Sequence, residues 1–117
     1  MVTIYHNPRC SNSRGALEII RAAGIEPQVI EYLNTPPSFE TLENLLTQMQ
    51  MPARELLRDK ESIYAELDLA NPKWSEIELL DFMVAYPVLI NRPIVVTERG
   101  VRLCRPPEVV REILPGA

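Results

Sequence analysis

The hydrophobic pattern at the start of the chain predicts a strand, a helix and a second strand. Residues 2–5 are mostly β-branched or aromatic, which is typical of a short strand. Residues 16–23 carry apolar side chains at helical spacing, and Ser11 and Ser13 before them suit a helix start. Residues 28–33 alternate enough to form another strand. This order predicts a parallel strand pair joined by a crossover helix.

The middle of the chain, about residues 38–87, has the patterns of several helices. Ser38 suits the start of one helix, and Ser75 with Glu78 forms a capping-box pattern at the start of another. The first of these helices carries an apolar stripe at positions i, i+3, i+4 and i+7, namely Leu42, Leu45, Leu46 and Met49. We therefore expect a helical insertion between the second strand and the rest of the sheet.

The end of the chain predicts a hairpin and a last helix. A β-branched run at residues 94–97 and a second strand-like segment at residues 101–104 flank a turn that ends at Gly100. Pro106 and Pro107 suit the opening of a helix that buries its apolar side chains. The whole order predicts an α/β fold with a mixed sheet of about four strands.

Composition narrows the classes of protein that this chain can be. Its 117 residues are 46% hydrophobic and 24% charged, which predicts one globular domain over residues 1–117. A net charge of -4 argues against a broad nucleic-acid surface. We find no signal-peptide pattern and no apolar run of about 18 residues, so we expect a cytoplasmic protein away from the membrane. Nothing in the sequence indicates an oligomer, and we expect a monomer.

Cys10 is the strongest candidate for chemistry. It lies between the first strand and the first helix, where free amides and the helix dipole favour an anion such as a thiolate. This field lowers the pKa of a thiol, and His6, Arg9 and Arg14 would add positive potential. A thiolate placed there can attack an electrophile while the amides hold its oxygens. The alternative interpretation is that Cys10 serves only as a small apolar residue. Its position in a loop makes this interpretation less favoured.

Cys104 has the pattern of a structural thiol, because it alternates with its neighbours on the predicted last strand. Ser13 stands where a Cys-x-x-Cys pair would have its second cysteine. The second thiol of a redox reaction must then come from Cys104 or from a separate molecule. A disulfide between the two cysteines stays open. Two cysteines and one histidine are too few for a zinc site.

Four segments, in order and over nearly the whole chain, resemble the glutaredoxin-coupled arsenate reductases of the ArsC family. The first is the Cys10 segment at residues 5–14, and the others are residues 55–58, 89–96 and 102–110. The resemblance implies a thioredoxin-like fold and a cis peptide bond at Pro93.

The resemblance also implies roles for individual residues. Cys10 would attack arsenate and form an arsenic–sulfur adduct, and His6 would help to keep it as a thiolate. The residues that would bind arsenate or complete its site are Arg58, Arg92, Arg105, Asn7 and Ser13. Glutathione would be the co-substrate and glutaredoxin the partner that supplies electrons, with no bound cofactor and no metal.

Without the resemblance, the sequence supports an anion-binding role for some of the three arginines more than for others. Arg58 by itself fits an ordinary helix surface, whereas Arg92 and Arg105 each precede a proline beside a strand, which holds their backbones extended. Guanidinium groups suit tetrahedral oxyanions because they stay charged and donate from a planar fork. Two alternatives stay open: a related thiol oxidoreductase with another substrate, and an Spx-like regulator that binds RNA polymerase. Such regulators usually carry a Cys-x-x-Cys switch.

Overall fold

The computed structural model describes residues 1–116 and divides into two compact units. The sheet unit comprises Met1–Thr35 and Arg92–Ala117, and the helical unit comprises Pro36–Asn91. The helical unit thus interrupts the sheet unit in sequence, and it extends a few residues beyond the predicted insertion of about residues 38–87 at both ends. The prediction of a single domain over the whole chain stays a prediction.

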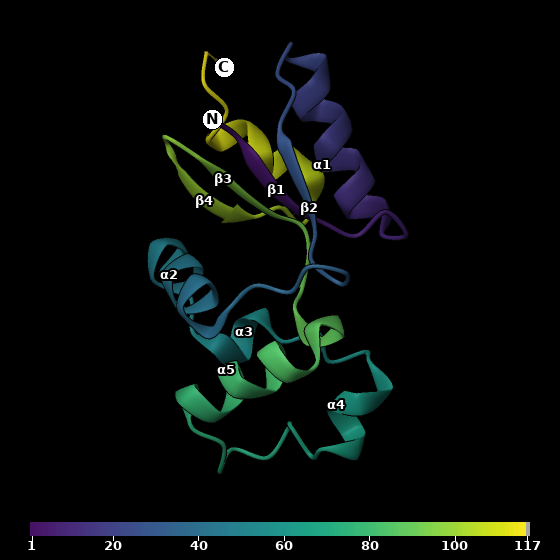
Figure 1. Ribbon diagram of the computed structural model, residues 1–117, viewed down its shortest axis with the longest axis vertical. Coiled ribbons are helices and arrows are strands. Elements are labelled where there is room, and N and C mark those ends of the chain that lie inside the picture. The colour runs from purple at the N-terminus through teal and green to yellow at the C-terminus, as the bar shows by residue number, and fades with distance from the viewer. Residues whose placement is uncertain (117) are drawn as a thin grey trace. The chain divides into compact units, whose positions relative to one another are not determined.

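The sheet unit contains a four-stranded mixed sheet (Figure 1). Its strands are β1 (Thr3–His6), β2 (Gln28–Glu31), β3 (Ile94–Thr97) and β4 (Gly100–Leu103). Their order is β2-β1-β3-β4, with β1 parallel to β2 and both other pairs antiparallel. The predicted parallel pair, hairpin and number of strands are confirmed.

Helix α1 (Ser11–Ala22) connects β1 to β2 and begins directly after Cys10, so only the predicted choice of Ser11 or Ser13 as its cap is wrong. Cys10 itself is the N-cap residue, with extended backbone angles (φ -93°, ψ 124°) and no side-chain cap. Ser11 and Ser13 therefore lie in the first turn rather than at the cap. This shift places the cysteine directly at the positive end of the helix dipole.

The last helix is a 3-10 helix, η2 (Pro107–Glu112), rather than an α-helix. It packs closely on α1, since a Cβ atom added to Gly15 would lie 2.8 Å from Cγ of Pro107. Both helices bury apolar side chains against the same part of the sheet. This core contains Val2, Ile4, Ala16, Ile20, Val95, Cys104, Val110, Ile113 and Leu114.

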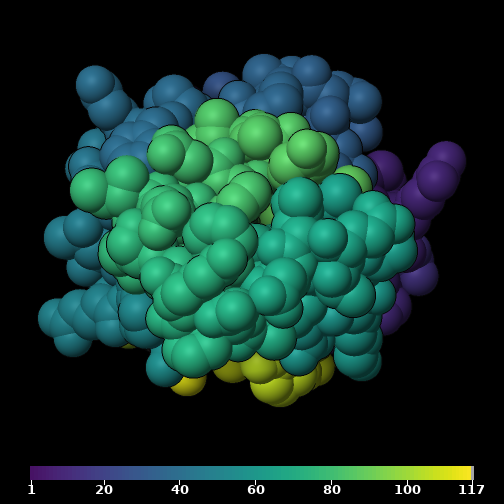
Figure 2. Space-filling model, turned by 90° about the horizontal axis from the view of Figure 1, so that it is seen from below, coloured from purple at the N-terminus to yellow at the C-terminus, as the bar shows by residue number. Residues whose placement is uncertain are grey.

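The helical unit contains α2 (Phe39–Met49), α3 (Ala53–Leu56), α4 (Ser62–Glu66), α5 (Glu76–Ala85) and the 3-10 turn η1 (Pro87–Leu89). Figure 2 shows one face of this unit in teal and green. The predicted caps are confirmed: Ser38 Oγ accepts the N–H of Thr41, and Ser75 with Glu78 forms the capping box. Ile77, in the first turn of α5, is 61% exposed although it is apolar.

Two backbone hydrogen bonds tie the segment after α3 to the end of the helical unit. The N–H of Arg58 donates to the carbonyl of Leu89 at 2.8 Å, and the N–H of Asn91 donates to the carbonyl of Leu56 at 3.0 Å. Leu57 and Ile90 form an antiparallel bridge between these bonds. Arg58 is therefore held on a fixed backbone within its unit.

Over residues 1–116, the helices are too short or too polar for any of them to cross a bilayer.

Candidate active site

Cys10 is held at the start of α1 by the turn that leaves β1. Its N–H donates to the carbonyl of Asn7, and its carbonyl accepts the N–H of Arg14, both at 3.0 Å. The backbone N–H groups of Asn12 and Ser13 lie close enough to the Cys10 sulfur to lower the pKa of the thiol, although they form no side-chain cap with it. These amides have no partner within the helix, as expected for its first turn. The thiol is partly exposed and free, so other molecules can reach it.

Two arginines that are far from Cys10 in sequence contact its sulfur. Nη1 of Arg105 lies 3.8 Å from Sγ, and the same nitrogen donates to the carbonyl of Arg92 at 2.8 Å. The side chain of Arg92 also hydrogen-bonds the sulfur. Arg92 and Arg105 flank the β3–β4 hairpin, so the antiparallel pairing of its strands brings their positions together. The cis bonds at Pro93, as expected from the resemblance, and at Pro106 follow these two arginines.

The pKa of Cys10 is lowered from 9.0 to about 7 by opposing effects. Partial burial raises it, but the amides of Ser13 and Asn12 and the side chains of Arg92 and Arg105 lower it by more. Each of these donors stabilises the thiolate over the thiol. At neutral pH Cys10 therefore has a larger fraction of thiolate, the nucleophilic form, than an ordinary cysteine.

Asn7 and Ser13 secure the loop that carries Cys10. The N–H of Asn7 donates to Oγ of Ser13 at 3.3 Å, and Oδ1 of Asn7 accepts the N–H of Arg9 at 3.0 Å. Both side chains are buried, so these hydrogen bonds fix the turn without competition from water. Direct contact of either residue with a substrate stays a prediction.

Tyr32 belongs to the site, although the sequence analysis did not single it out. Its side chain is 1% exposed, and the side chains of Asn7 and Arg92 hydrogen-bond its hydroxyl. Burial is the main cause that raises the pKa of Tyr32, so the hydroxyl stays protonated at neutral pH. Tyr32 connects the Cys10 loop to one of the arginines. Tyr32 reaches the site through the strand register, because Glu31 pairs with His6 and Tyr32 therefore follows at the level of Asn7.

His6 is buried at the end of β1, with 5% of its surface exposed. Burial is the main cause that lowers its pKa; Glu31 raises it, and Arg21 and Arg14 lower it further. The imidazole is therefore uncharged at neutral pH, and the positive charge at Cys10 comes from Arg92 and Arg105 instead. Whether His6 takes part in catalysis stays a prediction.

Arg58 lies in the helical unit, where Nε forms an ion pair with Oε2 of Glu61 at 3.0 Å. Both side chains are partly exposed, so the pair contributes little to stability. The structure thus assembles Arg92 and Arg105 at the thiol, whereas the role of Arg58 in anion binding stays a prediction.

Cys104 is a structural thiol, as the sequence predicted. It is 0% exposed within the core of the sheet unit, and its Sγ donates to the carbonyl of Arg102 at 3.6 Å. Burial and then Glu112 raise its pKa, while Arg102 lowers it, with a net rise to about 12. Both cysteines are free, so no disulfide joins them in this structure.

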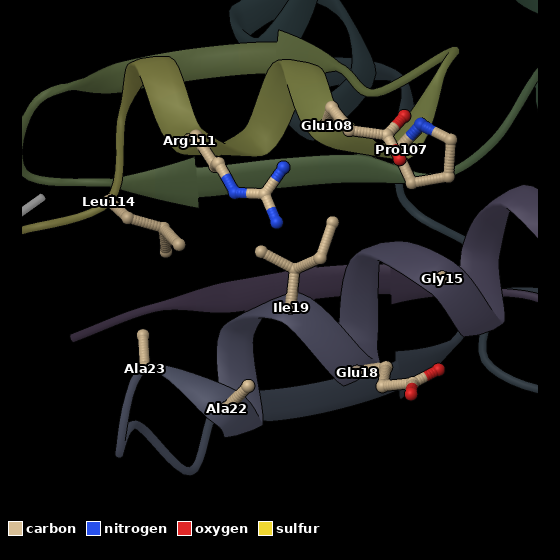
Figure 3. Close-up of a pocket in the computed structure, with 9 residues that line it drawn as sticks. All are labelled: Gly15, Glu18, Ile19, Ala22, Ala23, Pro107, Glu108, Arg111 and Leu114. Atoms are coloured by element: carbon tan, nitrogen blue, oxygen red, sulfur yellow. The ribbon is translucent and has the colours of Figure 1, made fainter.

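A groove between α1 and η2 is separate from the residues that surround Cys10. Arg111 points into it from η2 and Ile19 from α1 (Figure 3). None of the residues that line it contributes to the surroundings of Cys10 described above. Within residues 1–116, no cluster of three or more His, Cys, Asp or Glu side chains is arranged to hold a metal ion.

Comparison with known proteins assigns this chain to a family. The sequence model of the ArsC family matches residues 5–113. An arsenate reductase of Escherichia coli is 55% identical over 116 residues, which are 99% of this chain and 82% of the relative. An arsenate reductase of Rhizobium meliloti (strain 1021) is 54% identical over 114 residues, or 97% of this chain and 81% of the relative.

A solved structure shows the same likeness in three dimensions. The arsenate reductase from Vibrio cholerae superimposes with a TM-score of 0.93 and 47% identity, over 97% of each chain. Agreement of this extent, together with the four-stranded mixed sheet, confirms the predicted thioredoxin-like fold. The chain therefore belongs to the ArsC family.

Proposed function

We propose that this protein reduces arsenate to arsenite, with Cys10 as the nucleophile and external thiols as the source of electrons. The observation that carries the proposal is a thiol with a pKa of about 7 that two guanidinium groups contact. The relatives that match nearly the whole chain are arsenate reductases, which supports the choice of oxyanion.

Arsenate suits the charges around Cys10. It is a tetrahedral oxyanion, and the arginine fork presents parallel donors to two of its oxygens. Arg92 and Arg105 supply these donors, with the amides at the start of α1. We assign Arg58 to the same anion by resemblance, as a third cation. The arginines also stabilise the negative charge that develops on the oxygens during attack.

The reaction has three balanced steps. The Cys10 thiol and arsenic acid first give a Cys10–S–As(V) adduct and one water, with arsenic still pentavalent. A glutathione thiol then attacks the Cys10 sulfur; the S–As bonding pair leaves with arsenic, which departs as arsenite, and its proton goes to an arsenite oxygen. A second thiol, on glutaredoxin or glutathione, finally attacks the mixed disulfide and restores the Cys10 thiol.

The state of Cys104 supports an external electron source. A fully buried thiol with a pKa of about 12 is almost wholly protonated at neutral pH, and the thiolate is the form that attacks a disulfide. Ser13 occupies the other position from which a thiol could attack a mixed disulfide at Cys10, and it has no thiol. The second and third thiols therefore belong to other molecules. The cytoplasmic location, the monomeric state and the absence of a cofactor are part of the same proposal.

The test is reduction of arsenate by the purified chain with glutathione and glutaredoxin, followed through oxidation of NADPH by glutathione reductase. We expect turnover that depends on arsenate and disappears in Cys10→Ser. Omission of glutaredoxin should lower the rate, because the mixed disulfide is then resolved only by glutathione. Absence of turnover above the enzyme-free rate, with both reductants present, would contradict the proposal.

The alternative of a regulator that binds RNA polymerase gains no support from the site. Ser13, at the position of the second switch cysteine, is buried and its hydroxyl accepts the N–H of Asn7. This residue is part of the loop structure rather than an accessible redox group.

A further inference from the structure

A second, polar cleft adjoins the Cys10 loop in the sheet unit. It has a volume of about 370 Å³ and is formed by the loop after β1 and the turn after β2. Its lining residues are His6, Asn7, Pro8, Arg9, Glu31, Leu33 and Asn34. The cleft falls within the size range of small-molecule sites. Nothing in the proposed arsenate chemistry uses its charged residues.

The cleft carries one charge of each sign. Arg9 comes from the Cys10 loop and Glu31 from the end of β2, and both side chains are exposed. The turn after β2 is ordered by two backbone hydrogen bonds, from Asn34 and Thr35 to the carbonyl of Glu31 at 2.9 and 3.0 Å. The Arg9 backbone is fixed by its bond to Oδ1 of Asn7. Both charged residues are thus presented from ordered backbone.

His6 also lines the cleft, and its Nδ1 is buried with no hydrogen-bond partner among residues 1–116. Because this atom has almost no exposed surface, a ligand in the cleft does not reach it directly. The contacts available to a ligand are therefore those of the exposed charged residues, Arg9 and Glu31.

We propose that this cleft binds the reductant of the proposed reaction, a small zwitterionic thiol peptide such as glutathione. The ammonium group of the γ-glutamyl residue pairs with Glu31 and its carboxylate with Arg9. Leu33, which is 41% exposed, covers the methylene groups between them. This inference rests on the proposed function, since that function supplies the need for an external thiol.

Position along the chain explains how the bound thiol reaches its target. Arg9 directly precedes Cys10, so their Cα atoms are about 3.8 Å apart. A peptide anchored at Arg9 therefore keeps its thiol near Cys10. Binding in the cleft thus positions the glutathione thiol for the step already described, in which its sulfur attacks the Cys10 sulfur and arsenite leaves.

The charges also separate this cleft from the arsenate site. A doubly charged oxyanion is repelled by the Glu31 carboxylate, whereas a zwitterion is attracted by both residues. Two sites with different charge patterns let arsenate and the thiol bind without competition.

Binding is tested with S-methylglutathione, which keeps the charges of glutathione but cannot react. Titration into the isotope-labelled full chain should give saturable amide shifts at Arg9, Glu31, Leu33 and Asn34. Arg9→Gln and Glu31→Gln should each weaken this binding, and raise the KM for glutathione, by about tenfold, as expected for one charge-assisted contact. The alkylation midpoint of Cys10 should stay near 7 in both variants.

Arg111→Gln and Glu108→Gln are matched controls, because both residues line the other groove of the sheet unit. They should leave the binding of S-methylglutathione unchanged. The proposal is overturned if the cleft amides do not shift or if the KM for glutathione is unchanged in both cleft variants. A rise in the KM for glutaredoxin alone would make the cleft a protein docking surface and also overturn it. Saturable binding in a protein that does not reduce arsenate would refute the proposed function and leave the cleft assignment standing.

Discussion

The start of α1 and the end of β4 each hold one cysteine, and the two regions give it opposite properties. Cys10 is partly exposed beside free amides and two guanidinium groups, with a pKa of about 7. Cys104 is enclosed in apolar side chains, with a pKa of about 12. The same side chain is therefore a nucleophile in one place and an inert core residue in the other.

Arg105 shows that sequence neighbours do not decide this difference. It directly follows Cys104, yet its guanidinium lies 3.8 Å from the sulfur of Cys10. The hairpin directs the charge away from the adjacent thiol and towards the distant one. Reactivity in this fold depends on where donors converge in space.

The largest effect on turnover should come from replacing the cysteines, one at a time, by other residues. Cys10→Ser should reduce arsenate turnover to the enzyme-free rate, because a serine hydroxyl is not ionised at neutral pH. Cys104→Ala should keep turnover within a few-fold while lowering the free energy of unfolding, as expected for a buried truncation. The coupled NADPH assay and urea unfolding measure the two quantities. A comparable loss of turnover in Cys104→Ala would show that the second thiol is internal.

The next effect should follow removal of the guanidinium at Cys10. Arg105→Gln should raise the pKa of Cys10 by about 1 unit, as expected when a neighbouring opposite charge is removed. It should also raise the KM for arsenate at least about tenfold, because a charged contact is lost. The pH dependence of iodoacetamide alkylation reports the pKa.

Arg102→Gln is the matched control for this substitution. Arg102 lies on the same hairpin, but it acts on the pKa of Cys104 rather than on that of Cys10. Its loss should leave the alkylation midpoint of Cys10 near 7. Equal shifts in the two variants would indicate a general charge effect and would contradict the specific contact.

A smaller effect is expected from Tyr32→Phe, which removes a buried hydroxyl and keeps the ring. Asn7 and Arg92 then lose a shared acceptor, at a cost of about 1 kcal/mol, or roughly fivefold in the KM for arsenate. Tyr64→Phe in the helical unit should change neither the KM nor the Cys10 alkylation midpoint. If only the free energy of unfolding changed in Tyr32→Phe, Tyr32 would be a core residue without a positioning role.

The last comparison concerns the pH dependence of stability, where the two thiols should act in opposite directions. Between about pH 7 and 9 the unfolded chain keeps the Cys10 proton that the folded chain has lost, so Cys10 makes stability rise with pH. Between about pH 9 and 12 the folded chain keeps the Cys104 proton that the unfolded chain has lost, so Cys104 makes stability fall.

Urea unfolding at a series of pH values, for the wild type and each cysteine variant, separates these contributions. Cys10→Ser should remove the rise and Cys104→Ala should remove the fall, each as a difference from the wild type. Parallel curves for the wild type and Cys10→Ser from pH 7 to 9 would mean that folding leaves the Cys10 pKa unchanged.

Much of the fold could be predicted from the sequence because its signals are local. The caps at Ser38 and Ser75 and the alternating strands depend on residues within one or two turns of each other. The same holds for Cys10, whose place between a strand and a helix already indicates a stabilised thiolate. The arginines were found through resemblance, and for Arg92 and Arg105 also through the prolines beside them.

The missed features depend on packing between distant segments. Tyr32 enters the site only through the register of β2 on β1, which a single sequence does not specify. The form of η2 is another case, since it lies against α1 where Gly15 leaves room for Pro107. Ile77 shows the limit of a local pattern in another way, since it is an apolar residue of α5 and yet is 61% exposed.

The β3–β4 hairpin has a consequence for engineering. Its open end carries both arginines of the site, and its turn at Glu98 and Arg99 lies at the far end of four paired residues. Inserted residues at the turn would leave the strand register intact, whereas one residue added within either strand would separate the two guanidinium groups. A reporter sequence placed at Glu98 should therefore spare the proposed oxyanion site, which makes this turn a suitable attachment point for a sensor built on this scaffold.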